Sequence, residues 1–202
     1  MFKKFILDKS IAIIKDNYKE YDDDKIDEIK YGLEATYLSL TKTVVILFIA
    51  FLLGIFKESI LVLLFFNGLR LTGFGIHAKE SWMCWVSSSI VFLGIPLLCI
   101  YVNTSLIIQY IIMFVSILCF LLYAPADTVK RPLIRKNKRI KFKILTLIIA
   151  FIYVLTFFYI ENTFLKNVIV YSMFLEAVLI HPLTYRVFKL PYKNYERYVY
   201  SK

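Results

Sequence analysis

The stretch TSLIIQYIIMFVSILCFLLYA, residues 104–124, contains no charged residue and is apolar at most positions. A helix needs about 20 consecutive, mostly apolar residues to cross the hydrocarbon core of a bilayer. This stretch meets that requirement, so it predicts a transmembrane helix. It therefore decides the fold class, and the rest of the chain is interpreted around it.

Five further apolar stretches lie on either side of this one, at residues 39–56, 59–73, 82–101, 144–160 and 164–183. The third and fourth of these have the length of a full crossing. The first two are short and meet at a tight KES turn, so they either tilt or fall short of a full crossing. The last one carries Lys166 and Glu176. We predict an all-α polytopic membrane protein with about six transmembrane helices.

The composition agrees with a membrane protein and narrows the function classes. Hydrophobic residues make up 59% of the 202 residues, against about 45–50% in a soluble domain. Three cysteines without a CxxC spacing do not form a disulfide framework. Two histidines and three scattered cysteines make a structural zinc site improbable. We expect no metal and no cofactor.

The net charge of +10 is first of all a topology signal rather than a sign of nucleic-acid binding. The loop at residues 130–143 has eight basic residues and no acidic one, and the tail at 186–202 has five basic and one acidic. Cytoplasmic loops carry an excess of Lys and Arg. With six spans, we predict that both termini and the loop at 70–81 face the cytoplasm. The basic loop is also expected to contact anionic lipid.

The segment before the spans is amphipathic. Ile26, Ile29, Leu33, Tyr37 and Leu40 recur at helical spacing, and charged residues fill the other faces. This pattern is typical of interfacial helices on the cytoplasmic leaflet, and equally of helices that pack on a partner subunit.

The chain is therefore divided into three predicted regions. Residues 1–38 form interfacial or cytoplasmic amphipathic helices, residues 39–185 form the six-span membrane domain, and residues 186–202 form a basic cytoplasmic tail.

A polar interruption, GFGIHAKESWMC at residues 73–84, contains a histidine and a cysteine seven positions apart, His77 and Cys84. An imidazole can take the proton of a thiol and so activate it as a nucleophile. On one continuous helix these residues would be about 10 Å apart along the axis, so they can interact only across a bend. The spacing alone favours an ordinary membrane loop with a packing cysteine.

The same stretch contains the residues that a bend needs. Gly73 and Gly75 can end the preceding helix, and Ser81 is a suitable N-cap for the next one. Trp82 is then the first helical residue and Cys84 the third. The positive end of the helix dipole stabilises a thiolate there.

Two blocks of sequence together resemble the accessory gene regulator protein B (AgrB) family. The first is RLTGFGIHAKESWMC at 70–84, and the second is YAPADTVKRPL at 123–133. The matching positions are Arg70, Gly75, His77, Ala78, Cys84, Ala124, Pro125, Ala126, Asp127 and Pro132. Many members have two adjacent glycines before the histidine, whereas this chain has Phe74. The resemblance extends over essentially the whole chain.

The resemblance implies a cysteine endopeptidase in the cell membrane of a Gram-positive bacterium. Cys84 would be the nucleophile and His77 the general base. The substrate would be an AgrD-type pro-peptide, cut near its C-terminal side and cyclised to a thiolactone or lactone through a thioester. No cofactor is implied, and a homodimer is plausible. The alternative function is a non-enzymatic transporter or exporter of a small peptide.

Other residues of the two blocks have two readings each. Arg70 either binds a substrate carboxylate or a backbone carbonyl, or it snorkels to the interface. Asp127 either orients His77 as a third catalytic residue, or it caps a turn or pairs with Lys130 or Arg131.

The remaining candidates have supporting roles. Gly75 and Pro132 are expected to shape the loops, and Lys130 and Arg131 to attract an acidic substrate tail. Glu176 lies deep in the last span, where ionisable groups are expensive and often functional. It either lines a cavity with Lys166 or Gln109, or it is protonated.

Overall fold

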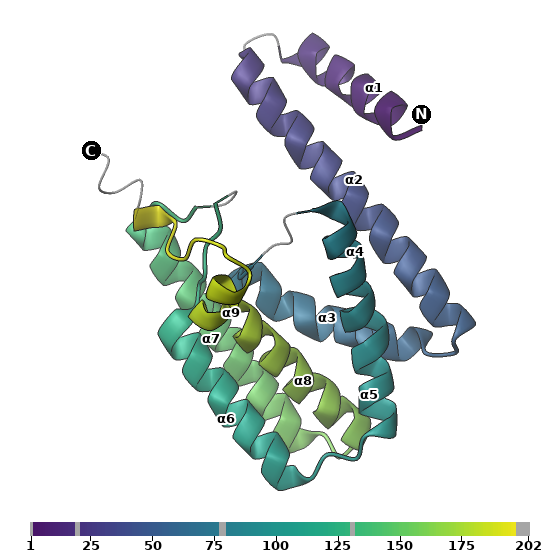
Figure 1. Ribbon diagram of the computed structural model, residues 1–202, viewed down its shortest axis with the longest axis vertical. Coiled ribbons are helices and arrows are strands. Elements are labelled where there is room, and N and C mark those ends of the chain that lie inside the picture. The colour runs from purple at the N-terminus through teal and green to yellow at the C-terminus, as the bar shows by residue number, and fades with distance from the viewer. Residues whose placement is uncertain (1, 19–20, 77–79, 130–131, 197–202) are drawn as a thin grey trace. The chain divides into compact units, whose positions relative to one another are not determined.

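The computed structural model describes residues 2–18, 21–76, 80–129 and 132–196, and every regular element in these ranges is a helix (Figure 1). The helices are α1 (Phe2–Asn17), α2 (Asp23–Leu52), α3 (Phe56–Gly73), α4 (Ser81–Ser89), the π-helix η1 (Ile90–Gly94), α5 (Ile95–Tyr101), α6 (Leu106–Tyr123), α7 (Lys136–Tyr159), α8 (Thr163–Ile180) and α9 (Pro182–Val187). The predicted all-α fold class is confirmed.

The chain divides into two compact units, Met1–Phe51 and Leu52–Lys202. The first unit contains α1 and nearly all of α2. The amphipathic stripe and the first predicted span lie in one continuous helix, so α2 has no break at residue 38. The hydroxyls of Thr36 and Thr41 donate to the carbonyls of Gly32 and Tyr37, which keeps these polar groups satisfied within the helix.

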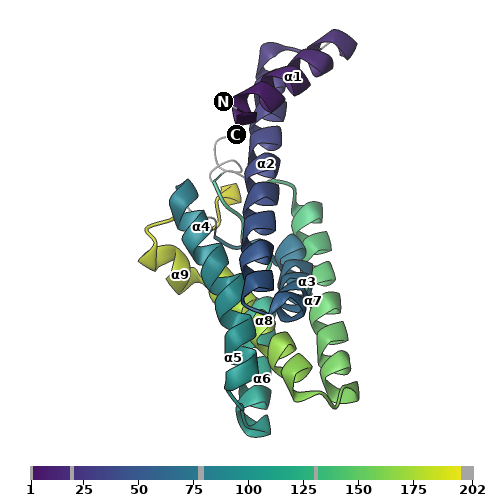
Figure 2. The same cartoon turned by 90° about the vertical axis from the view of Figure 1, so that its right-hand side faces the viewer.

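Five helical segments are long and apolar enough to cross a membrane: Gly32–Leu52, Trp82–Tyr101, Leu106–Tyr123, Lys136–Tyr159 and Thr163–Ile180. They coincide with five of the six predicted spans, which confirms a polytopic protein. The predicted span at 59–73 lies in α3, which is not among the five. Helix α3 carries Lys57, Glu58 and Arg70. It lies across the directions of α5 and α7 (Figures 1 and 2). The count of six is therefore not confirmed.

The predicted span at 82–101 is helical throughout but changes its winding in the middle. Helix α4 passes into the π-helical turn η1, which is followed by α5. Pro96, at the start of α5, has no N–H to give to the preceding turn. A π-turn next to a proline re-routes the backbone hydrogen bonds without ending the helix.

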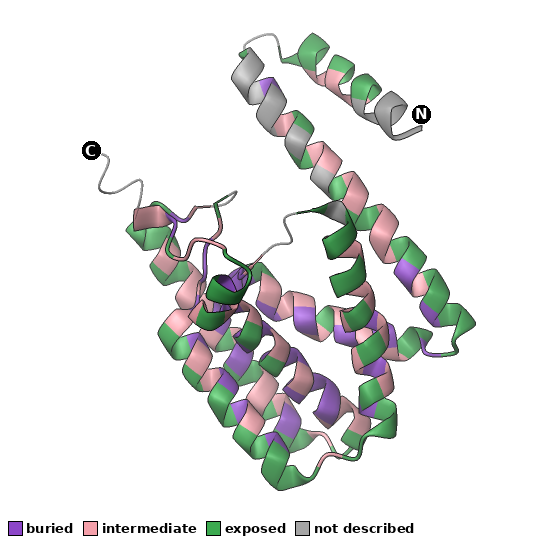
Figure 3. Ribbon diagram, viewed as in Figure 1, coloured by how far each residue is buried: buried purple, intermediate pink, exposed green. Residues whose placement is uncertain are grey.

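Helix α8 is the centre of the second unit. It packs against α3, α5, α6 and α7, and Figure 3 shows that buried residues recur along it. Its buried residues are Asn167, Val168, Ile169, Val170, Ser172, Met173, Glu176, Ala177 and Ile180. By contrast, α6 and α7 expose large apolar side chains such as Ile107, Phe114 and Phe151. Exposed apolar surface of this extent suits helices that face lipid.

Candidate functional site

Helix α3 ends in a turn with two consecutive residues at positive φ. Phe74 has φ 64° and Gly75 has φ 83°, and the N–H of Phe74 donates to the Arg70 carbonyl at 3.2 Å. A positive φ is unusual for a residue with a side chain. The Phe74 ring is 5% exposed and packs edge-on against Phe142, with centroids 4.9 Å apart. Burial of this ring offsets the backbone cost of the positive φ.

The two sequence blocks meet at this turn. Phe74 and Ala126 form a parallel bridge, in which Gly75 N–H donates to Ala126 O at 2.8 Å and Ala126 N–H donates to Gly73 O at 2.9 Å. A third segment joins from α8, because Ile76 N–H donates to Leu179 O at 3.1 Å. Backbone hydrogen bonds therefore hold the turn that precedes residue 77 from two sides.

Gly75 is tightly enclosed as well as left-handed. A Cβ atom at this position would lie 2.8 Å from the Leu179 carbonyl oxygen. We expect Gly75→Ala to lower the free energy of unfolding by about 1–3 kcal/mol, through backbone strain and this clash. Thermal unfolding of the purified protein in detergent measures the change. Gly94→Ala is the control, because a Cβ there meets nothing closer than 4.0 Å. Equal Tm values for the two variants would contradict this reading of the turn.

Arg70 points into the protein and contacts the turn. Its Nη2 donates to the Ile76 carbonyl, and its Nη1 lies 3.6 Å from Oε2 of Glu176, with side chains 17% and 0% exposed. Arg70 therefore binds a backbone carbonyl of its own chain, while its predicted role toward a substrate stays a prediction.

Glu176 does not pair with either partner suggested by the sequence. The Gln109 side chain instead donates to Asn167 Oδ1 at 2.7 Å, and Lys166 Nζ lies 5.2 Å from the centre of the Phe157 ring. The charged partner of Glu176 is Arg70. The sequence did not indicate this pairing, since the two residues belong to different helices far apart in the chain.

Cys84 lies in the first turn of α4. The helix begins at Ser81 with Glu80 as an extended N-cap, one residue earlier than predicted, so Cys84 is the fourth helical residue. Its N–H donates to the Glu80 carbonyl at 3.2 Å, which is the first hydrogen bond of the helix. Glu80 also accepts a hydrogen bond from Trp82 Nε1. Cys84 is half-buried.

His77, Ala78 and Lys79 lie outside the described residues. The predicted approach of His77 to the Cys84 sulfur therefore stays a prediction. The same is true of Lys130 and Arg131 in the second block. The residues that flank these two gaps are described: Ile76 and Glu80 on either side of the first, and Val129 and Pro132 on either side of the second.

Asp127 organises the second block. It is 3% exposed, and its carboxylate accepts backbone N–H groups from Leu133 at 3.3 Å, Asn194 at 2.9 Å and Tyr195 at 2.8 Å. The carboxylate therefore caps backbone N–H groups of two segments, and its predicted alternative role beside His77 stays a prediction because His77 lies outside the described residues. Half-buried Pro132 adjoins this group through Leu133.

Helix α9 and the segment after it are part of this arrangement, which the sequence did not predict. The Tyr185 hydroxyl donates to the carbonyls of Ala126 and Asp127 at 3.2 and 3.0 Å, and Asn194 is 1% exposed. Burial raises the pKa of Tyr185 well above its usual range and that of Tyr192 to about 12. Both hydroxyls therefore keep their protons at neutral pH. The only sequence signal was the tyrosine-rich composition of a segment read as a basic tail.

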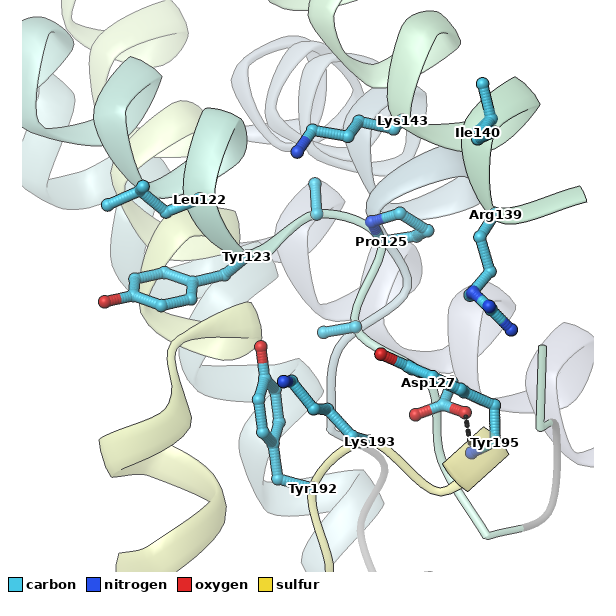
Figure 4. Close-up of a pocket in the computed structure, with 12 residues that line it drawn as sticks. Leu122, Tyr123, Pro125, Asp127, Arg139, Ile140, Lys143, Tyr192, Lys193 and Tyr195 are labelled. Atoms are coloured by element: carbon cyan, nitrogen blue, oxygen red, sulfur yellow. Dashed lines mark hydrogen bonds between the residues drawn. The ribbon is translucent and has the colours of Figure 1, made fainter. Parts of the chain in front are cut away.

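A pocket lies between this loop, the end of α6, the start of α7 and the C-terminal segment (Figure 4). Its lining is Leu122, Tyr123, Ala124, Pro125, Ala126, Asp127, Arg139, Ile140, Lys143, Tyr192, Lys193 and Tyr195. The Arg139 guanidinium lies 3.9 Å from the centre of the Tyr195 ring. The polar part of the lining combines three basic side chains (Arg139, Lys143 and Lys193), three tyrosines and the Asp127 carboxylate, and the remainder is apolar. Cys84 is not in its lining.

Comparison with known proteins decides the family. Residues 7–180 match the family described as Accessory gene regulator B. The chain belongs to the AgrB family. The matched range contains the turn at Gly73–Ile76, Cys84, the Asp127 loop and Glu176, whereas the segment after α8 lies beyond it.

Several curated relatives cover most of the chain. A "Putative AgrB-like protein" of Clostridium acetobutylicum is 32% identical over 171 residues, 83% of this chain and 80% of the relative. One of Listeria innocua is 32% identical over 193 residues, 93% and 92% of the two chains. The "Accessory gene regulator protein B" of Staphylococcus saprophyticus is 31% identical over 177 residues, 85% and 88%. No solved structure matches the chain.

Within the described residues, no group of three or more His, Cys, Asp or Glu side chains is arranged to hold a metal ion.

Proposed function

We propose that this AgrB family member is a membrane-embedded cysteine endopeptidase that cleaves an AgrD-type quorum-sensing pro-peptide and promotes its cyclisation. The observation that carries the proposal is the position of Cys84. Cys84 lies in the first turn of α4, seven residues after His77. The backbone just before His77 is held by the hydrogen bonds of Gly75 and Ile76 to Ala126 and Leu179. The first turn of a helix is where the helix dipole stabilises a thiolate.

In the first step, His77 takes the proton of the Cys84 thiol, and the thiolate attacks the scissile carbonyl carbon. The carbon–nitrogen bond breaks, the imidazolium gives its proton to the leaving amine, and the N-terminal part of the peptide remains as a thioester. Backbone N–H groups before the first intrahelical hydrogen bond of α4 point out of its N-terminus. They suit a developing oxyanion in a site that excludes water.

In the second step, a thiol or hydroxyl within the bound peptide gives its proton to His77 and attacks the thioester, and Cys84 leaves as a thiolate. The product is a thiolactone or a lactone. Exchange of one thioester for another is nearly isoenergetic, so no ATP is required. Holding the internal nucleophile next to the thioester can lower the barrier by about 7–11 kcal/mol. Exclusion of water favours cyclisation over hydrolysis.

The pocket behind the Asp127 loop suits an acidic part of the substrate, which a basic, tyrosine-rich lining attracts. We expect Lys143→Glu to raise KM for the precursor about tenfold at low salt and to leave kcat nearly unchanged. The difference is expected to shrink as salt rises.

Initial-rate measurements across a salt series test this expectation. Lys141→Glu makes the same charge change on an exposed residue of α7 that does not line the pocket. Identical KM values for the two variants would exclude the pocket as a substrate site.

Purified protein in liposomes separates the enzyme from the alternative of a peptide transporter. The precursor is added on the accessible side without a gradient or a second protein, and its mass is followed. The proposal requires a cleaved, cyclised product. Movement of the intact precursor across the bilayer without cleavage would support the transporter instead.

A further inference from the structure

We infer that Glu176 is a positioning residue of the catalytic turn: its carboxylate holds the Arg70 guanidinium in place, and Arg70 in turn holds the backbone directly before His77. The inference rests on the proposed function, since it assigns Glu176 a part in presenting His77 to Cys84. Neither Glu176 nor Arg70 takes part in the bond-breaking and bond-making steps proposed above.

Glu176 is fully buried in α8, one of the apolar segments long enough to span the membrane. Ionisable groups in such segments are costly and require a partner. Arg70 Nη1, at 3.6 Å, is the partner that the structure provides. Within the described part of the chain, no hydrogen bond reaches either carboxylate oxygen. The ion pair with Arg70 is therefore the polar interaction that the described residues offer this carboxylate.

Arg70 transmits this contact to the turn. Its second nitrogen donates to the Ile76 carbonyl, so the guanidinium lies between the buried carboxylate and the residue that precedes His77. A planar guanidinium with several donors in a fixed geometry suits this bridging role, which a lysine ammonium cannot reproduce.

The same helix holds the turn at a second point. Leu179 O accepts the Ile76 N–H at 3.1 Å, and residues three apart share one face of a helix. One face of α8 thus fixes both polar groups of Ile76, the N–H directly and the carbonyl through Arg70.

The glycines of the turn allow this close approach. A Cβ atom at Gly73 would lie 2.6 Å from Glu176 Oε1, and one at Gly75 would lie 2.5 Å from Arg70 Nη1. The turn therefore fits directly over the ion pair. Gly73, Gly75, Arg70 and Glu176 form one contact region, although Glu176 comes from a distant part of the sequence.

The test compares Glu176→Gln with wild type by steady-state cleavage of the precursor and by amide hydrogen exchange. We expect kcat to fall about 10–100-fold while KM stays within about twofold, because a misplaced base slows the chemistry but not the binding. Peptides covering residues 73–76 are expected to exchange faster, with α6 unchanged. Ser172→Ala, a fully buried polar residue on the same helix, is the control and keeps both values.

Two further variants cover the case in which Glu176→Gln does not fold. Arg70→Lys keeps the charge but loses the second nitrogen, so kcat should fall as in Glu176→Gln. Glu176→Asp keeps the charge and should lose less. Wild-type kcat and wild-type exchange in whichever of Glu176→Gln and Arg70→Lys folds would overturn the inference. Failure of the wild type to cleave would overturn the proposed function instead, while the exchange comparison would still decide whether Glu176 holds the turn.

Discussion

Cys84→Ala is expected to lower kcat/KM for precursor cleavage by at least about 10³-fold, the scale on which loss of a catalytic nucleophile acts. The variant removes the sulfur that forms the thioester in the proposed mechanism, so both cleavage and cyclisation should stop. Cys84 lies in the first turn of α4, and it is half-buried, so removal of its sulfur should leave the fold intact. Co-expression with the precursor, followed by mass analysis, measures the effect.

The other two cysteines of the chain provide matched controls. Cys99 is buried in α5 and Cys119 is half-buried in α6, so neither lies in the first turn of α4, where Cys84 is found. Cys99→Ala and Cys119→Ala should therefore cleave at rates close to wild type, whereas His77→Ala should lose activity like Cys84→Ala. Equal activity of Cys84→Ala and Cys119→Ala, at equal protein levels, would refute the assignment of the nucleophile.

Asp127→Ala is expected to have the largest effect on stability. The carboxylate accepts three backbone N–H groups, two of them from the segment after α9. Each buried donor left without an acceptor costs about 1–3 kcal/mol. We therefore expect a loss of about 3 kcal/mol or more in the free energy of unfolding, with the segment at 190–196 detached first.

Thermal unfolding and limited proteolysis of the C-terminal segment measure this loss. Asp127→Asn keeps one accepting oxygen and should fall between wild type and Asp127→Ala. The comparison also separates the two readings of Asp127 made from the sequence. Wild-type stability with abolished cleavage in Asp127→Asn would argue for a catalytic partner of His77 and against the capping role.

Hydropathy was sufficient to predict most of the helices, because a segment that faces lipid must be apolar over its whole length. The stretch at 104–124 contains α6, and the start of the helix at Ser81 was predicted to within one residue. Helix α3 shows the limit of this method. Its composition resembles a short span, but its direction across α5 and α7 depends on packing, which hydropathy does not describe.

Contacts between distant segments could not be predicted from one sequence. The resemblance gave Arg70, Gly75 and Asp127 as candidates, but the pairing of Arg70 with Glu176 requires α3 and α8 to be neighbours. The charges of residues 186–202 predict a basic tail, but they do not indicate that Asn194 within it is buried. The sequence thus indicated Arg70 and Gly75 as candidates, but it did not indicate that Glu176 of α8 contacts Arg70.

The most direct test of the central claim is the mass of the protein itself during turnover. A precursor whose internal nucleophile has been replaced by alanine cannot complete cyclisation, so the acyl-enzyme should accumulate. We predict an adduct equal to the N-terminal part of the precursor, sensitive to hydroxylamine and mapped to Cys84. Cleavage that proceeds without this adduct, and at the same rate in Cys84→Ala, would contradict a cysteine endopeptidase.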